Sequence, residues 1–245
     1  MPLFDTPRTV ILLPGTGSDA RFVEEAFGPA VANVGSAVTA VRPEPSALVA
    51  GYRRALDLAA EAAVTPIVVG GVSIGAAVAL GWAADNPGRV AAVLVALPAW
   101  TGDGSDAPAA ASAHATADLL RSIGLEAAIA AMTASSPPWL SRMLSRSWRE
   151  QWPDLPAALD EAAQYTSPTT QVLRTVRVPV GIVAAVDDPV HPVDVARHWA
   201  AEIPVAALTT LTLDRLGTDP SVLGRLCVDA VRGADEKGSA QLLHG

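Results

Sequence analysis

The feature that most constrains this chain is a regular alternation of short apolar runs with helical patterns. The runs have the length and the Val, Ile and Ala content of buried strands, and they cover residues 10–13, 37–41, 67–72, 90–97, 178–186 and 206–213. Helical patterns cover residues 20–32, 46–63, 74–84, 193–201 and 220–231. Such alternation predicts an α/β fold with a mostly parallel central sheet and helices on both faces.

The alternation fails once, between residues 97 and 178. Four segments there carry helical periodicity, at 111–123, 125–134, 139–152 and 155–165. A structureless loop of that length is uncommon in a compact domain. We therefore predict a helical cap at 101–169, inserted into a core made of residues 1–100 and 170–232. Residues 233–245 are small and polar without an apolar period, which predicts a loose tail.

Composition excludes several classes of protein. A net charge of −8 over 245 residues leaves no basic field for nucleic acid or for an acidic membrane surface. Cys227 is the only cysteine, which favours a core residue in a reducing compartment over a disulfide. The uncharged stretch 62–84 is broken by Pro66 and several glycines, so it predicts a strand followed by a helix and not a membrane span. With no secretion signal evident, we expect a cytoplasmic protein.

One motif carries chemistry. The segment Gly71-Val72-Ser73-Ile74-Gly75 matches G-x-S-x-G, follows a predicted strand and opens a predicted helix. Glycine-sized neighbours let such a turn close with the serine hydroxyl exposed above the sheet. The motif predicts a nucleophile at Ser73, and the alternative is a glycine-rich turn with a structural role only.

The order of a first glycine loop, the serine turn, a cap and an acidic loop over residues 9–231 resembles the α/β-hydrolase superfamily. The resemblance implies that backbone amides of Thr16 and Ile74 hold the oxyanion of a tetrahedral intermediate. The glycine loop is Pro14-Gly15-Thr16-Gly17-Ser18, with Pro14 where many members have histidine. The alternative for this loop is a simple turn that feeds the next helix.

The family's acid is implied at Asp188. Its pattern G-x-x-D-x-x-x-P reappears at residues 185–192, with Ala185 in place of the glycine. Such a carboxylate orients an imidazole and stabilises it once it is charged. Asp187 is an alternative acid, and either carboxylate could instead cap the helix that follows.

The family's histidine follows the last strand, where this sequence has Thr218. A serine hydroxyl needs a base within hydrogen-bond reach, so the departure puts enzymatic activity in question. His191 is the best candidate because it shares a loop with Asp188, although a residue so close to the acid more often points sideways. The weaker candidates are the remaining histidines, His114, His198 and His244.

Two sets of side chains in the predicted cap have open interpretations. Trp139, Trp148 and Trp152 lie near other apolar residues, and they either line an apolar substrate pocket or seal the cap onto the core. The spacing of Arg142, Arg146 and Arg149 forms a helical stripe, which either binds a carboxylate substrate or faces solvent.

The sequence favours a serine hydrolase acting on an ester, thioester or related carbonyl substrate. We expect a small-molecule partner, no cofactor and no metal; the substrate's identity and the oligomeric state stay open. One alternative is a catalytically silent member of the fold that binds a small apolar ligand under its cap. Another is an NADP-binding oxidoreductase, because residues 15–20 also fit G-x-G-x-x-A. Lys237 is the only lysine, which excludes a Tyr-x-x-x-Lys reductase site.

Overall fold

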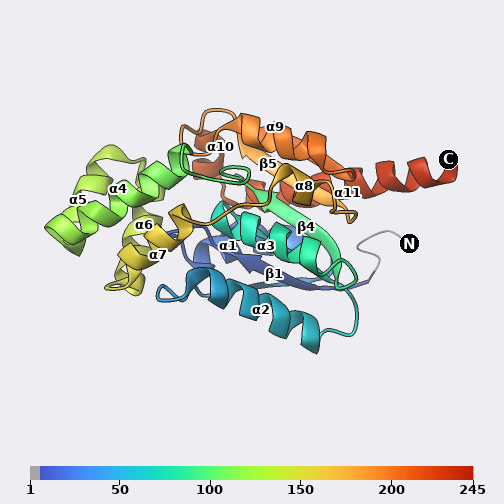
Figure 1. The fold of residues 1–245 in the computed structure, drawn as a ribbon, viewed down its shortest axis with the longest axis horizontal. Helices are drawn as coiled ribbons and strands as arrows, with labels where there is room; N and C mark the ends of the chain where they lie inside the picture. The colour runs from blue at the N-terminus through green and yellow to red at the C-terminus, as the bar shows by residue number, and fades with distance from the viewer. Residues whose placement is uncertain (1–5, 245) are drawn as a thin grey trace.

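The computed structural model describes residues 6–244, with side chains described up to residue 238. Six strands form one sheet in the order β2-β1-β3-β4-β5-β6, and every pairing is parallel (Figure 1). Their bounds are β1 Thr9–Leu13, β2 Ala37–Ala40, β3 Ile67–Val72, β4 Val90–Ala96, β5 Val180–Ala185 and β6 Ala206–Leu211. Each coincides with a predicted apolar run, so the predicted α/β fold is confirmed.

Helices cover both faces of this sheet. On one face α1 (Ala20–Ala32) and α11 (Ser221–His244) form an apolar layer that includes Phe27 and Leu223. On the other face lie α2 (Leu48–Ala62), α3 (Ile74–Asp85) and α9 (Val193–Glu202), whose layer includes Tyr52, Trp82 and Trp199. Burial of each large apolar side chain contributes roughly 1.5–3 kcal/mol, so the two layers hold the sheet from both sides.

Five helices lie between β4 and β5, and the first four form an inserted segment. These four are α4 (Pro108–Ile123), α5 (Leu125–Ser135), α6 (Pro138–Gln151) and α7 (Leu155–Ala163), and they gather beside one end of the sheet, at the left of Figure 1. They share a small apolar core around Leu120, Trp148 and Leu159. In α7, the Glu161 carboxylate accepts hydrogen bonds from the first two amides of α2, at 2.8 and 3.0 Å, which ties this inserted segment to the sheet domain.

The structure differs from the sequence-based expectation in three places. Helix α11 continues to His244, so residues 233–244 are helical where a loose tail was predicted. The short helices α8 (Thr170–Leu173) and α10 (Leu213–Thr218) were not predicted.

The uncharged stretch 62–84 contains β3 and most of α3, and no helix within residues 6–244 is long and apolar enough to cross a bilayer. Cys227 is buried, and this burial raises the pKa of its thiol.

The strand order reverses at β1, which pairs with β2 on one side and β3 on the other. In parallel sheets, ligands bind at the carboxyl edge beside such a reversal. Here the end of β1 meets the turn between β3 and α3 backbone to backbone, with no side chain between them. A Cβ atom at Gly71 or at Gly75 would lie 2.3 Å from the Leu13 carbonyl oxygen, so only glycine fits at either position.

We expect Gly75→Ala to lower the free energy of unfolding by about 1–3 kcal/mol, because the added methyl group must displace backbone atoms of Leu13 and Pro14. The matched control is Gly233→Ala in α11, where an added Cβ meets nothing within 4 Å and should raise stability by up to ~1 kcal/mol. Urea unfolding monitored by circular dichroism measures both. Equal effects of the two substitutions would contradict the close approach.

Candidate active site

Ser73 lies on a strained turn between β3 and α3. Its φ is 54° and its ψ −118°, a left-handed conformation that costs energy for any residue with a side chain. Two hydrogen bonds hold the backbone there, from the Ser73 amide to the Ala96 carbonyl at 2.9 Å and from the Ala77 amide to the Ser73 carbonyl at 3.1 Å. The turn therefore has the geometry that the G-x-S-x-G motif predicts.

The imidazole of His191 lies between Ser73 and Asp188. Its Nε2 is 3.0 Å from Ser73 Oγ, and its Nδ1 is 2.8 Å from Asp188 Oδ2. The ring does not point sideways, even though His191 and Asp188 share the loop after β5. Three predicted site residues thus form a continuous chain of hydrogen bonds, the arrangement by which an imidazole can remove a proton from a serine hydroxyl.

A local turn at Asp188 sets this arrangement. Asp188 Oδ1 accepts hydrogen bonds from the backbone amides of Val190 at 2.8 Å and His191 at 3.1 Å, which folds the chain back over its own carboxylate. The Asp188 side chain is only 7% exposed. Burial opposes its ionisation, but the hydrogen bond and charge attraction of His191 and the two amides outweigh burial and lower its pKa. The carboxylate therefore stays charged next to the imidazole.

The glycine loop approaches Ser73 closely from the end of β1. A Cβ atom at Gly15 would lie 3.5 Å from Ser73 Cβ, and a hydrogen bond from the Ser18 amide to the Gly15 carbonyl at 3.0 Å closes a turn that contains Thr16. Ile74 is the first residue of α3, so its amide has no acceptor within the helix. The geometry thus brings the loop with Thr16 beside the turn with Ile74, and their role as oxyanion donors remains a prediction.

Comparison with known proteins identifies the family. A family model described as the alpha/beta hydrolase family matches residues 5–222. The chain belongs to this family. No curated protein sequence matches it.

Solved structures share the fold of this family member at low sequence identity. A hydrolase from Oleispira antarctica superposes with a TM-score of 0.72 at 15% identity, over 92% of this chain and 91% of the other. An enol-lactonase from Burkholderia xenovorans gives 0.66 at 15% identity, over 90% and 91%. The esterase RhEst1 from a Rhodococcus species gives 0.62 at 19% identity, over 90% and 91%.

The place where the family carries its histidine belongs here to α10. Thr218 ends this helix and is exposed. Asp187 accepts a hydrogen bond from the Leu213 amide at 2.8 Å, so this alternative acid binds the start of α10, and the carboxylate bonded to the His191 imidazole is that of Asp188. Trp139 of α6 packs on Gly217, where a Cβ would lie 2.2 Å from the indole. In this protein, α10 provides a packing surface for α6.

Two other histidines of this hydrolase-family protein have partners elsewhere. His198 Nε2 is 3.0 Å from Thr170 Oγ1, and His114 Nδ1 is 2.9 Å from Asp160 Oδ1 in the inserted segment. The side chain of His244 lies outside the described side chains. Among residues 6–238, His191 is the one histidine with a hydrogen bond to Ser73.

The arginine stripe contacts the protein's own carboxylates. Arg146 pairs with Asp19, and Arg149 pairs with Glu126. Two of the three guanidinium groups therefore already bind carboxylates of the protein, which argues against the interpretation that the stripe binds a substrate carboxylate. Of the three tryptophans in α4–α7 and their connections, Trp148 is buried in the core of the inserted segment, Trp139 is half-buried, and Trp152 is 39% exposed.

The start of α1 does not suit the alternative prediction of a bound dinucleotide. Asp19 caps this helix by accepting the Phe22 amide at 2.8 Å, so a protein carboxylate already occupies the end where a pyrophosphate would bind. Gly17 is covered by the Trp148 indole. Within the described residues, no group of three or more His, Cys, Asp or Glu side chains could hold a metal ion.

The lowered pKa of Asp188 gives a pH-dependent contribution to stability. Because its pKa in the folded state lies below the unfolded value of about 3.9, the contribution is present above that pH and is lost as pH falls through the folded pKa. We expect wild type to exceed Asp188→Asn in free energy of unfolding at pH 6, with the difference shrinking below about pH 4. Urea titrations across this range measure it, and a difference independent of pH would contradict the assignment.

Proposed function

We propose that this protein is a serine hydrolase that cleaves an ester, thioester or related carbonyl substrate through a nucleophilic Ser73. One observation carries the proposal, the His191 imidazole within hydrogen-bond distance of both Ser73 Oγ and Asp188. The names of two structural neighbours, an esterase and an enol-lactonase, support the ester class of substrate.

The residues support a two-stage mechanism. His191 Nε2 removes the proton from Ser73 Oγ as the oxygen attacks the substrate carbonyl, and Asp188 stabilises the imidazolium that forms. The amides of Thr16 and Ile74 donate to the developing oxyanion. His191 then gives the proton to the leaving group, leaving an acyl ester on Ser73. Water, deprotonated by the same imidazole, hydrolyses that ester and regenerates the hydroxyl.

This proposal places acid and base on one loop. The family's usual histidine position after the last strand is then not needed, and Thr218 there is compatible with activity. The two-amide turn at Asp188 supports this assignment, because it holds the His191 backbone in place while the ring remains directed to Ser73. The half-buried apolar side chains of α6, including Trp139 and Leu144, pack against the core and favour a sealing role.

The activated serine is tested with a fluorophosphonate probe, which reacts with serines made nucleophilic by a neighbouring base. We expect wild type to be labelled and Ser73→Ala to remain unlabelled under the same conditions, as read by in-gel fluorescence and intact mass. Wild type that stays unlabelled between pH 6 and 9 would contradict the hydrolase and favour a silent protein that binds an apolar ligand.

The base is tested by comparing two histidine substitutions. We expect His191→Ala to lower kcat for p-nitrophenyl acetate on the order of 10³-fold or more, since a site without one triad member keeps only the acceleration from oxyanion donors and binding. His198→Ala, which removes an imidazole bonded to Thr170, is the control and should retain wild-type kcat. Equal kcat values in both variants would remove His191 from the mechanism.

A further inference from the structure

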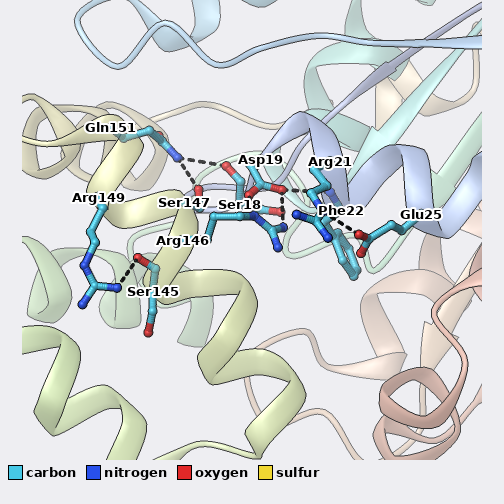
Figure 2. A network of polar contacts seen from close by, with 10 residues as sticks. All are labelled: Ser18, Asp19, Arg21, Phe22, Glu25, Ser145, Arg146, Ser147, Arg149 and Gln151. Carbon is cyan, nitrogen blue, oxygen red and sulfur yellow. Dashed lines mark hydrogen bonds and ion pairs between the residues drawn. The ribbon is translucent and has the colours of Figure 1, made fainter.

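The glycine loop beside Ser73 is fixed at both ends by different elements. At its start, the buried Tyr52 hydroxyl of α2 donates to the Pro14 carbonyl at 3.0 Å. At its far end, side chains of α6 contact Gly17, Ser18 and Asp19. Figure 2 shows the contacts to Ser18 and Asp19. The loop therefore depends on the inserted segment as well as on the sheet domain.

The strongest contact is a bidentate ion pair between Arg146 and Asp19. Arg146 Nε lies 2.7 Å from Oδ2 and Nη2 lies 3.0 Å from Oδ1. The Asp19 side chain is 7% exposed and that of Arg146 28%, so solvent screens the pair little. A planar guanidinium bound through two nitrogens fixes orientation as well as distance. Because Asp19 also caps α1, the pair fixes the junction of loop and helix.

Two further side chains of α6 contact the loop itself. Gln151, which is buried, donates from Nε2 to the Ser18 carbonyl at 2.9 Å and to Ser147 Oγ at 2.7 Å (Figure 2). The indole of Trp148 covers Gly17, whose φ is 69° and where an added Cβ would lie 3.0 Å from Nε1. Gly17 is the neighbour of Thr16, so these contacts end one residue from the proposed oxyanion donor.

We propose that Arg146 and Gln151 are positioning residues that hold the loop so that the Thr16 amide points at the substrate's carbonyl oxygen. This inference rests on the proposed hydrolase function and extends it. An oxyanion donor acts only when it is held in place before the reaction, and a misplacement of about 1 Å can cost on the order of 10²-fold in rate. Helix α6 of the inserted segment thereby controls a donor that belongs to the sheet domain.

The chain offers two matched controls. Glu161 also joins the inserted segment to the sheet domain, but through the start of α2 and not through the glycine loop. Arg149 lies one turn from Arg146 on the same helix and pairs with the exposed Glu126. Glu161→Ala therefore reports the loss of the attachment to α2, whose Tyr52 binds only the start of the loop, and Arg149→Ala reports the loss of an arginine ion pair outside the loop.

The experiment measures kcat and KM for p-nitrophenyl acetate and Ki for a trifluoromethyl ketone, which forms a tetrahedral oxyanion adduct with an activated serine. We expect Arg146→Lys, Arg146→Ala and Gln151→Leu to lower kcat about 10- to 100-fold, less than the ~10²–10³ for a lost donor. KM should change little and Ki should rise in parallel with the fall in kcat. The pH dependence of kcat/KM should be unchanged, because the His191 contacts are untouched.

Asp19→Asn gives an independent arm, since asparagine retains the helix cap but not the charge. If the ion pair positions the loop, Asp19→Asn and Arg146→Ala lower kcat by similar factors, and the double variant loses no more than either one. A double variant whose loss in kcat equals the product of the two single losses would overturn the proposal. Arg146→Lys and Gln151→Leu preserve the test if Arg146→Ala fails to fold.

Wild-type kcat and Ki in Arg146→Lys and Gln151→Leu would overturn the proposal, as would losses no larger than that of Glu161→Ala. These results differ from failure of the hydrolase function itself. In that case wild type would show neither fluorophosphonate labelling nor trifluoromethyl ketone binding that depends on Ser73, and both proposals would fall together.

Discussion

The close approach of backbone to backbone at the reversal of strand order is the constraint on which the candidate site depends. The Leu13 carbonyl leaves room only for glycine at positions 71 and 75, so the end of β1 lies directly against the turn at Ser73. The loop that continues from Leu13 is thereby brought to the serine. A side chain at either glycine would separate the two segments, and the hydroxyl and the loop amides would no longer share one small space.

The sequence predicted the sheet and most helices because buried parallel strands leave a strong signal of short apolar runs. It missed α10, since six residues are too few for periodicity and the Asp187 carboxylate that binds its start lies 26 residues from Leu213 in the chain. It also ended α11 too early. Residues 233–244 lack an apolar face, yet they are rich in good helix formers such as Ala, Glu and Leu, so an established helix can continue.

At the candidate site, too, local motifs were readable from the sequence and contacts between distant residues were not. Ser73 and Asp188 stand in local motifs, so both could be named as candidate site residues from the sequence. The direction of the His191 ring was not readable, because it follows from two backbone amides folding around Asp188 and from the placement of β5 relative to β3. The pairing of Asp19 with Arg146 spans 127 residues and left no local signal. Contacts of that kind exist only once the inserted segment has docked.

With the proposed acid and base on one turn, the positions of only some parts of the fold affect the candidate site. Their mutual geometry is set within four residues, by the Asp188 carboxylate and its own backbone. Their distance to Ser73 is set by adjacent strands, through the Ser73 amide on the Ala96 carbonyl of β4 and the Leu97 amide on the Val183 carbonyl of β5. The last strand and α10 supply no side chain to these hydrogen bonds, although their backbone bonds to the residues just before Asp188, since the Leu211 carbonyl accepts from the Val186 amide and the Leu213 amide donates to Asp187. Gly217 of α10 is accordingly a packing surface for Trp139.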